Sequence, residues 1–237
     1  MHLTRVTLLT DEFPTMDNYP FSLAIYQKTK QIALNAPVTF FIGENGTGKS
    51  TLLEAIAHRS GFHIWRGLDR SRFEVNPYED DLYRFIRLEW TNGMVPGSFF
   101  AADIFRNFAK NLDEWSSNDP GMLKYFGGKS LMSQSHGQSL MSFFRTRYKI
   151  KGLYLLDEPE TALSPKSQLE LLGLLHDVSR MGHAQFIVAT HSPILLACPD
   201  ADILNFNRLP LKSIGYEDTE YFKIYRDFLN NRKKYLS

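Results

Sequence analysis

The segment VTFFIGENGTGKSTLLEAIAHR occupies residues 38–59 and contains three successive signals of local structure. Its apolar start, at 38–42, predicts a short strand that is buried on both faces. The glycine-rich part, GENGTGKST at 43–51, matches the pattern G-x-x-x-x-G-K-[ST]. Residues 50–59 then continue into a predicted helix. A strand, this turn and a helix, in that order, form the context in which the pattern binds phosphate.

Each residue type in the glycine-rich turn has a physical reason to be there. Gly43, Gly46 and Gly48 let backbone N–H groups turn toward phosphate oxygens, which side chains would obstruct. Lys49 supplies a cation to the β- and γ-phosphates, and the Ser50 hydroxyl can ligate Mg²⁺. The positive end of the following helix points at the same anion. The segment therefore predicts a phosphate-binding loop.

Two further apolar runs end in side chains that can do chemistry. Residues 153–156 lead into Asp157 and Glu158, and residues 185–190 lead into His191. The carboxyl ends of parallel strands form the edge where α/β folds bind ligands. We expect Asp157 to hold Mg²⁺ through water, Glu158 to act as general base toward a water, and His191 to donate to a γ-phosphate. The structural alternative is that the acids mark an exposed strand end and the histidine is an ordinary surface or core residue.

The alternation of strand and helix signals predicts an α/β architecture. A second helix has a clear beginning, with Ser164 as N-cap and Pro165 at the first helical position. Gly182 is the residue at which we expect this helix to stop.

The remaining segments carry weaker signals. Residues 10–35 and 60–90 are rich in aromatic and alternating polar residues and predict an antiparallel flank. Residues 99–150 predict a helical section that is interrupted by turns at 118–121 and 127–128.

Composition narrows the class of protein. The chain has 237 residues with 43% hydrophobic content, which excludes a disordered chain, and its 27 basic and 26 acidic residues give no global basic field. The single cysteine, Cys198, excludes a disulfide framework and a multi-cysteine metal site. No apolar run approaches the roughly 18–20 residues of a membrane span, and the first residues lack the features of a secretory signal. We therefore expect a soluble, cytoplasmic protein.

Four motifs together resemble those of the ATP-binding-cassette (ABC) ATPase superfamily: GENGTGKST at 43–51, QSHGQS at 134–139, LYLLDEPETALS at 153–164 and ATHS at 189–192. Within it, the chain is most similar to small AAA-type ATPases related to the chromosome-maintenance and break-repair ATPases. The resemblance implies one P-loop domain with an ABC-like core sheet, an antiparallel β flank and a small helical lobe. Residues 1–98 and 151–237 would form the nucleotide-binding core, and residues 99–150 the helical lobe with the signature motif.

The resemblance also implies a role for particular residues. The catalytic residues would be Lys49, Glu158 and His191, and the ligands of Mg²⁺ would be Ser50 and Asp157. ATP would bind the phosphate loop (Walker A) through Gly43, Asn45, Gly46, Thr47, Gly48, Lys49, Ser50 and Thr51.

The signature motif implies a second subunit. Ser135, Gly137 and Gln138 match the family's S-G-G-Q, which family members present to the nucleotide of the partner subunit. A serine hydroxyl and a backbone N–H ahead of a helix that begins near Ser139 would suit an anion. Residues 162–164 lie where the family has its dimer-contacting loop.

Three positions depart from the family pattern or stay open. His136 replaces a glycine of the signature and could either donate to a γ-phosphate or obstruct it. The family's magnesium-coupling glutamine has no counterpart in the segment 99–108, which offers Asp103 and Asn107 instead. The aromatic residue that stacks on adenine has three candidates: Tyr19, Phe21 and Tyr26.

The leading hypothesis is Mg²⁺-dependent hydrolysis of ATP to ADP and phosphate, coupled to homodimerisation around two ATP molecules. The alternative is a slowly hydrolysing, ATP-gated module that binds DNA or a protein partner. Its motivating features are basic clusters, which are more often plain solvated surface: Arg66-Arg70-Arg72, Arg145-Arg147-Lys149 and Arg232-Lys233-Lys234. A transporter cassette is the third hypothesis, disfavoured by the lack of membrane spans and of a recognisable glutamine.

Overall fold

A six-stranded sheet with the order β5-β6-β7-β3-β8-β9 runs through the centre of the molecule. The computed structural model describes residues 1–64, 76–102 and 136–236, together with positions 105, 112, 114 and 116. The first five strands in this order are parallel, and β9 pairs antiparallel with β8 at the edge. The strands are β3 (Val38–Ile42), β5 (Gly97–Ala101), β6 (Gly152–Asp157), β7 (Ala184–Ala189), β8 (Asp202–Asn205) and β9 (Lys212–Ser213).

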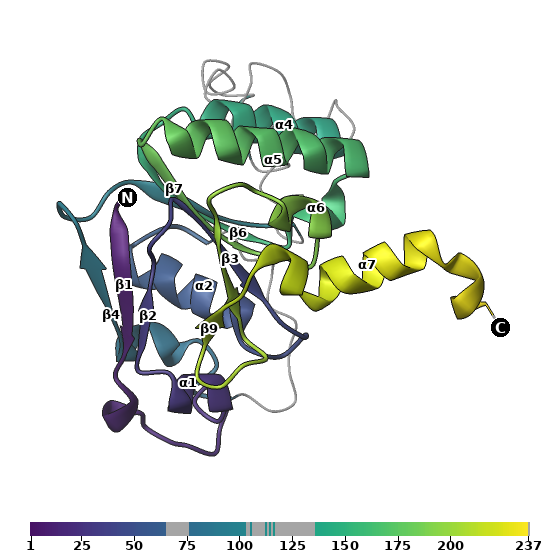
Figure 1. Ribbon diagram of the computed structural model, residues 1–237. Coiled ribbons are helices and arrows are strands. Elements are labelled where there is room, and N and C mark those ends of the chain that lie inside the picture. The colour runs from purple at the N-terminus through teal and green to yellow at the C-terminus, as the bar shows by residue number, and fades with distance from the viewer. Residues whose placement is uncertain are drawn as a thin grey trace.

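Helices and a smaller sheet cover the two faces of the central sheet, which gives three layers (Figure 1). Helices α4 (His136–Arg147) and α5 (Pro165–Arg180) pack against each other on one face. Helix α2 (Lys49–Arg59) and a three-stranded antiparallel sheet, β2-β1-β4, cover the other face. The small sheet confirms the predicted antiparallel flank, and its strands are β1 (Leu3–Leu8), β2 (Gln31–Ala33) and β4 (Ile86–Trp90).

Alternating side chains of the central strands supply a core to each face. In β3, Phe40 joins the cluster under α4 and α5, whereas Phe41 joins the cluster on the α2 side. In β6, Leu156 joins the cluster under α4 and α5, and Leu155 joins the cluster on the α2 side. All four of these side chains are fully buried. Strands with two buried faces need apolar residues at successive positions, which is why the sequence shows apolar runs and no polar alternation.

The ends of the predicted helices follow from their capping residues. Ser164 accepts a hydrogen bond from the backbone N–H of Ser167 at 3.2 Å, and Pro165 occupies the first position of α5. Beyond the helix, Gly182 has a φ of +74°, the left-handed conformation that commonly ends a helix. The predicted start and stop of this helix are therefore confirmed.

One buried amide joins the small sheet to the central sheet. The Gln185 Oε1 atom accepts from the backbone N–H groups of His2 and Leu3, each at 2.8 Å, and its Nε2 donates to the Leu3 carbonyl at 2.8 Å. Because Gln185 lies in β7 and Leu3 begins β1, this fully buried side chain fixes the edge of one layer to the other.

One expectation for the helical section is wrong. Phe99, Phe100 and Ala101 form the end of β5, which pairs with β6, because their side chains are buried on both faces of the sheet. The helix expected from about Ser139 is α4, whose described residues run from His136 to Arg147. The predicted turns at 118–121 and 127–128 lie outside the described residues.

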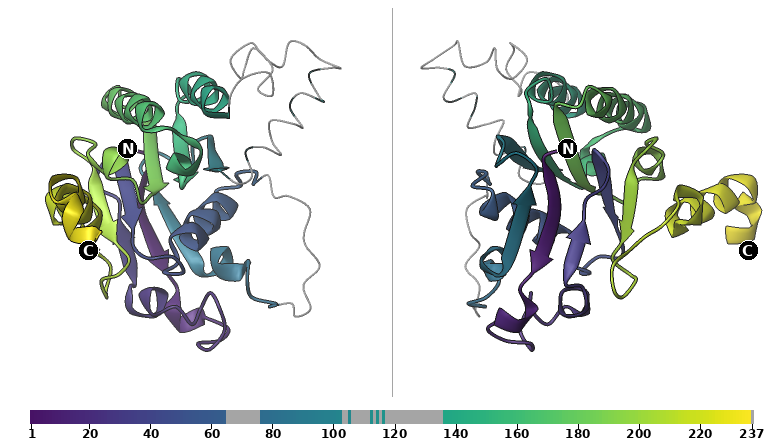
Figure 2. Two further views of the ribbon diagram at one scale, coloured as in Figure 1. Left: turned by 90° about the vertical axis from the view of Figure 1, so that its right-hand side faces the viewer. Right: turned by 60° about the vertical axis from the view of Figure 1, so that its left-hand side comes forward.

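The C-terminal part crosses back over the phosphate-loop end of the sheet and then leaves it. Helix α7 (Glu220–Asn230) extends away from the rest of the molecule (Figures 1 and 2). Among the helices of the described residues, none is both long and apolar enough to cross a bilayer. The other short elements are α1 (Ala24–Lys28), α6 (Pro193–Leu196) and the 3₁₀ turns η1 (Thr10–Glu12), η2 (Asp81–Phe85), η4 (Pro159–Ala162), η5 (Tyr216–Asp218) and η6 (Arg232–Tyr235).

Helix α5 offers a matched test of the core between α5 and the sheet. Leu171 is fully buried there, whereas Leu169 on the same helix is 58% exposed. We expect Leu171→Ala to lower the free energy of unfolding by about 2–4 kcal/mol, since it leaves a cavity. Leu169→Ala should change it by less than about 0.5 kcal/mol. Urea unfolding measures both values, and equal values for the two variants would contradict this packing.

Candidate functional site

The glycine-rich turn connects β3 to α2 and has the conformation that the motif predicts. Gly43, Gly46 and Gly48 have φ angles of +148°, +79° and +100°. At Gly48 a Cβ atom would lie 2.6 Å from the hydroxyl oxygen of Tyr26, which donates a hydrogen bond to the Gly48 carbonyl. Both backbone strain and this close approach therefore require glycine at position 48.

The lysine of the motif is held inside the turn. Lys49 is 4% exposed, and its Nζ donates to the carbonyl oxygens of Gly43 and Glu44, each at 2.8 Å. Burial lowers the pKa of the Lys49 amine, whereas the nearby charges of Glu158, Asp157 and Glu160 oppose that shift. The Lys49 amine is therefore held at the turn, and its acidic neighbours favour the protonated, positively charged form.

Ser50 and Asp157 bring the first motif and the acidic motif together. The Ser50 hydroxyl, at the start of α2, donates to Asp157 Oδ1 at 3.0 Å, although 107 residues separate them in the chain. A hydroxyl and a carboxylate are oxygen ligands of the kind Mg²⁺ prefers. No cluster of three or more His, Cys, Asp or Glu side chains suitable for a metal occurs in the described part of the chain. The donor set therefore fits an ion that takes its other ligands from water and from a phosphate.

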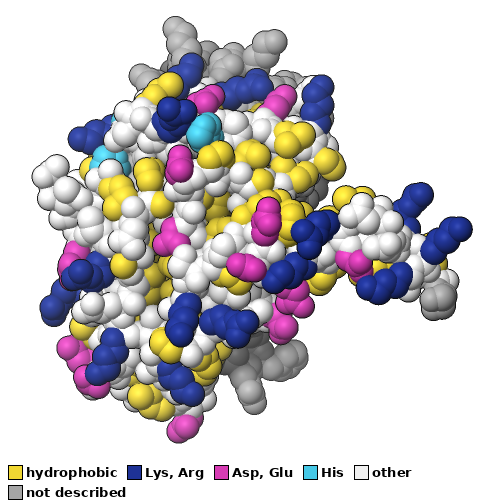
Figure 3. All heavy atoms as spheres, viewed as in Figure 1, with side chains coloured by type: hydrophobic (Ala, Val, Ile, Leu, Met, Phe, Trp, Pro, Cys, Tyr) yellow, Lys and Arg dark blue, Asp and Glu magenta, His cyan; other side chains and the backbone are white. Residues whose placement is uncertain are grey.

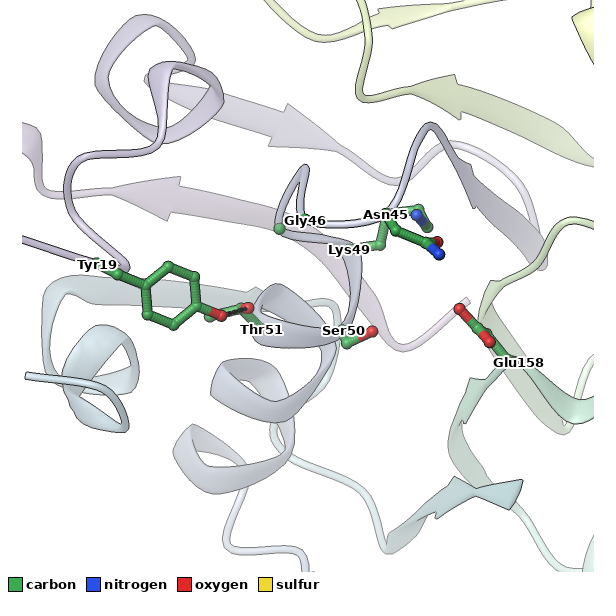
Figure 4. A pocket seen from close by; sticks show the side chains of 8 residues that line it. Tyr19, Asn45, Gly46, Lys49, Ser50, Thr51 and Glu158 are labelled. Atoms are coloured by element: carbon green, nitrogen blue, oxygen red, sulfur yellow. Dashed lines mark hydrogen bonds between the residues drawn. The ribbon is translucent and has the colours of Figure 1, made fainter. Parts of the chain in front are cut away.

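A pocket of about 260 Å³ opens at this turn. Figure 4 shows the Ser50 hydroxyl and the Glu158 carboxylate facing each other across it. At one end, the hydroxyls of Tyr19 and Thr51 lie 2.5 Å apart. The residues that line it are Tyr19, Asn45, Gly46, Gly48, Lys49, Ser50, Thr51 and Glu158.

Glu158 has a strained backbone. Its φ and ψ are +44° and +52°, a left-handed conformation that a non-glycine residue adopts at a cost of order 1–3 kcal/mol. Its N–H donates to the Ala189 carbonyl at 2.9 Å, which fixes the strained residue against the end of β7. Such strain is characteristic of functional positions, and here it turns the carboxylate toward the pocket.

His191 follows β7 and has defined contacts on three sides. Its backbone N–H donates to Glu160 Oε1 at 2.6 Å, and its Nε2 lies 3.3 Å from Glu158 Oε1 without hydrogen-bond geometry. Its Nδ1 lies 2.7 Å from the hydroxyl of Tyr221, which donates to the Gly43 carbonyl at 3.0 Å. The histidine is therefore part of a network that reaches the phosphate loop and is not an isolated surface residue.

The structure does not bring the signature residues to the same pocket. Gly137 and Gln138 lie in the first turn of α4, and neither lines the pocket at the phosphate loop. A Cβ atom on Gly137 would lie 3.6 Å from the Ala162 carbonyl oxygen, beside the expected dimer-contacting loop. Ser135 and the side chain of His136 lie outside the described residues, as do Asp103 and Asn107.

One of the three aromatic candidates lines the pocket. Phe21 and Tyr26 are fully buried, so neither ring can stack on a ligand. Tyr19 is 40% exposed and belongs to the pocket wall. The structure therefore retains Tyr19 alone among these three aromatic residues.

Three contacts at the site were not predicted from the sequence. Tyr221 touches His191 and Gly43 from a distant helix, and Glu160 fixes the backbone of His191. Asn207 Oδ1 accepts from the Glu44 N–H at 2.9 Å and so supports the phosphate loop from beyond β8. Only the position of Glu160, two residues after the acidic pair in the motif at 153–164, could have pointed to it. Tyr221 and Asn207 belong to no motif.

Substitutions of Glu160 test its buried contact. Burial raises the pKa of this carboxyl above its ordinary value of 4.5, so the folded protein binds the proton more tightly than the unfolded chain. Stability should therefore decrease as pH rises through the folded pKa, and Glu160→Gln should remove that decrease because it has no charge. Glu160→Ala should also cost about 1 kcal/mol, since the His191 N–H loses its acceptor.

Urea unfolding at a series of pH values measures both effects of Glu160. Wild type and Glu160→Gln with parallel pH dependence between pH 4.5 and neutrality would contradict the raised pKa. A stable Glu160→Ala protein would show that the His191 contact contributes nothing.

Two family models match parts of the sequence. The description "AAA domain, putative AbiEii toxin, Type IV TA system" belongs to the model that matches residues 121–197. A second model, described as "AAA domain", matches residues 22–58, which include the phosphate loop.

Curated relatives are ATP-binding proteins named for import or transport. The chain is 28% identical over 165 residues to the xylose import ATP-binding protein XylG of Pseudomonas syringae, covering 60% of this chain and 30% of XylG. It is 27% identical over 180 residues to the achromobactin transport ATP-binding protein CbrD of Dickeya dadantii, covering 70% of this chain and 66% of CbrD. The chain thus spans less than a third of the length of the first relative and about two thirds of the second.

Solved structures share the fold. A putative metal-chelate type ABC transporter has a TM-score of 0.54 at 18% identity, covering 95% of this chain and 88% of the other. An SMC head bound to the C-terminal winged-helix domain of ScpA has a TM-score of 0.52 at 14% identity, covering 79% of this chain and 93% of the other. These likenesses show the fold: the chain folds like a chain of an ABC transporter and like an SMC head. Together with the AAA-domain matches, the ATP-binding relatives and the site geometry, they support an ABC-type P-loop ATPase related to the chromosome-maintenance ATPases.

Proposed function

We propose that the protein hydrolyses ATP to ADP and phosphate in a Mg²⁺-dependent reaction, as a homodimer that encloses two nucleotides. The observation that carries the proposal is the 3.0 Å contact between Ser50 Oγ and Asp157 Oδ1, beside a pocket lined by the phosphate loop and Glu158. It supports one site in which an anion-binding turn, a metal-ligand pair and a base lie together.

Each residue has a distinct role in this proposal. Backbone N–H groups of the turn and Lys49 bind the β- and γ-phosphates. Bound Mg²⁺, held through Ser50 and Asp157, would neutralise charge that develops on the phosphate oxygens. Glu158 accepts a proton from the attacking water, and His191 donates a hydrogen bond to the γ-phosphate. Tyr19 is the aromatic residue that we propose for the adenine.

The position of Gly137 and Gln138 supports a dimer. Neither residue lines the pocket of its own chain, and both lie in the first turn of α4, whose positive end attracts anions. Gly137 also lies beside Ala162, so the signature and the expected dimer-contacting loop share one surface. We propose that this surface, formed by the start of α4 and the segment 162–164, covers the nucleotide bound to the core of a second copy.

Two variants test the reaction. Glu158→Gln should reduce kcat for phosphate release by at least about 100-fold, since it removes the general base. Lys49→Ala should abolish release, because the cation on the phosphates is lost. The exposed Glu217, outside the pocket, provides the matched control Glu217→Gln. Equal rates of phosphate release by wild type, the two site variants and the control would show that the activity does not belong to this site.

The same Glu158→Gln protein tests the dimer. With ATP and Mg²⁺ it should give twice the monomer mass in light scattering, because ATP bound at the interface is no longer hydrolysed. Lys49→Ala should stay monomeric under the same conditions. A Glu158→Gln protein that remains monomeric at every ATP concentration contradicts the dimer but not the hydrolysis.

The second candidate function, a transporter cassette, is favoured by the relatives named for xylose import and achromobactin transport. Retention of the protein by membranes from its native cell, with release only by detergent, would support this candidate over an ATPase that works without a permease. The cytoplasmic location also remains a prediction that this fractionation tests.

Binding of DNA or of a protein partner remains a prediction. Arg145 pairs with Glu170 at 3.0 Å, and Lys234 pairs with Asp227 at 2.7 Å, so part of two basic clusters is neutralised within the chain. Basic and acidic side chains are interspersed over the face shown in Figure 3, with several basic ones along α7. The cluster at Arg66 lies outside the described residues.

A further inference from the structure

The hydroxyl of Tyr221 joins two parts of the nucleotide site. Tyr221 lies in the first turn of α7, which is fixed by Thr219: the Thr219 side chain accepts from the Phe222 N–H at 3.2 Å. The Tyr221 ring stands nearly perpendicular to that of His191, with centroids 5.4 Å apart. Its hydroxyl reaches His191 Nδ1 at 2.7 Å and the Gly43 carbonyl at 3.0 Å. A helix that otherwise projects away from the molecule thus contacts the histidine and the phosphate loop.

The single proton of this hydroxyl links the phosphate loop to the state of the histidine. Burial raises the pKa of Tyr221, so the phenol keeps its proton. When that proton is donated to the Gly43 carbonyl, the Tyr221 oxygen can only accept from His191. A neutral imidazole has one N–H, which must then be on Nδ1 and leaves Nε2 without a proton.

The surroundings of Nε2 agree with this count. Nε2 is buried and has no hydrogen-bond partner among the described residues, although Glu158 Oε1 is only 3.3 Å away. An unprotonated Nε2 and a carboxylate oxygen are both acceptors, so they cannot form a hydrogen bond. With the Tyr221 proton on the Gly43 carbonyl, a neutral His191 is therefore in the tautomer that cannot donate toward the pocket.

We infer that Tyr221 is a positioning residue whose hydroxyl orientation sets which ring nitrogen of His191 carries the proton. For His191 to donate through Nε2, the Tyr221 hydroxyl has to turn from the Gly43 carbonyl to Nδ1. That turn leaves no buried carbonyl unpaired, because Lys49 Nζ also donates to Gly43 at 2.8 Å. In a neutral His191 ring, the hydrogen bond from Tyr221 to the phosphate loop and donation through Nε2 therefore exclude each other. The use of that donor for a γ-phosphate rests on the proposed function.

The tautomer can be read directly by NMR on protein labelled with ¹⁵N-histidine. At about pH 8.5, above the ordinary histidine pKa of about 6.5, long-range ¹H–¹⁵N spectra distinguish the two neutral tautomers. His191 signals are identified by their loss in His191→Gln. We expect a proton on Nδ1 in wild type and a shift toward Nε2 in Tyr221→Phe. Tyr225→Phe, in the same helix and 54% exposed, should match wild type.

Two NMR outcomes would overturn the inference. One is a wild-type ring protonated on Nε2, and the other is a Tyr221→Phe ring with the wild-type tautomer. Both Glu158 and Glu160, the carboxylates that contact His191, are unchanged in these variants, so neither can account for a difference. Because no hydrolysis is needed, the measurement remains decisive even if the protein proves inactive toward ATP.

Kinetics separate positioning from a merely structural role. Tyr221→Phe should change kcat by up to about tenfold, the usual range for one hydrogen bond, because it alters the preference between the two tautomers, with KM changed less than about twofold. In a His191→Ala background the same substitution should have no further effect on kcat, since Tyr221 acts through the ring. A raised KM with unchanged kcat, or a full additional loss in the double variant, would show that Tyr221 only supports the loop.

Discussion

The contact between Ser50 and Asp157 is the constraint on which the site depends. It joins the start of α2 to the tip of β6 across 107 residues of sequence. The contact requires that β3 and β6 end at the same edge, which parallel pairing through β7 provides: Phe41 and Asp157 are both in register with Ala189. An antiparallel β6 would send the acidic pair to the opposite edge of the sheet.

The strand between these two contributes the remaining chemistry. β7 ends two residues before His191, and its Ala189 carbonyl accepts a hydrogen bond from the N–H of the strained Glu158. Glu158 and His191 are therefore held by one strand end, while buried clusters on both faces keep that strand in place. Strain at Glu158 persists because this surrounding structure determines its backbone.

Local patterns were sufficient where chemistry and structure are encoded by neighbouring residues. The phosphate loop, three central strands and the caps of α5 were predictable because a glycine-rich turn, an apolar run and a capping serine act within a few residues. The strand at Phe99–Ala101 was missed because a short apolar run before a helical pattern fits either structure. Tyr221 and Glu160 could not be predicted, since their roles arise from the return of α7 to the loop and from burial.

Metal binding tests the central claim, that Ser50 and Asp157 form one metal-ligand pair beside the phosphate loop. Electron paramagnetic resonance would follow Mn²⁺, used in place of Mg²⁺, as it binds to the protein with ATP. Ser50→Ala and Asp157→Ala should each weaken Mn²⁺ binding at least about tenfold, whereas Asp11→Ala, on the far 3₁₀ turn, should not. Unchanged Mn²⁺ affinity in both site variants, with ATP still bound, would contradict the account.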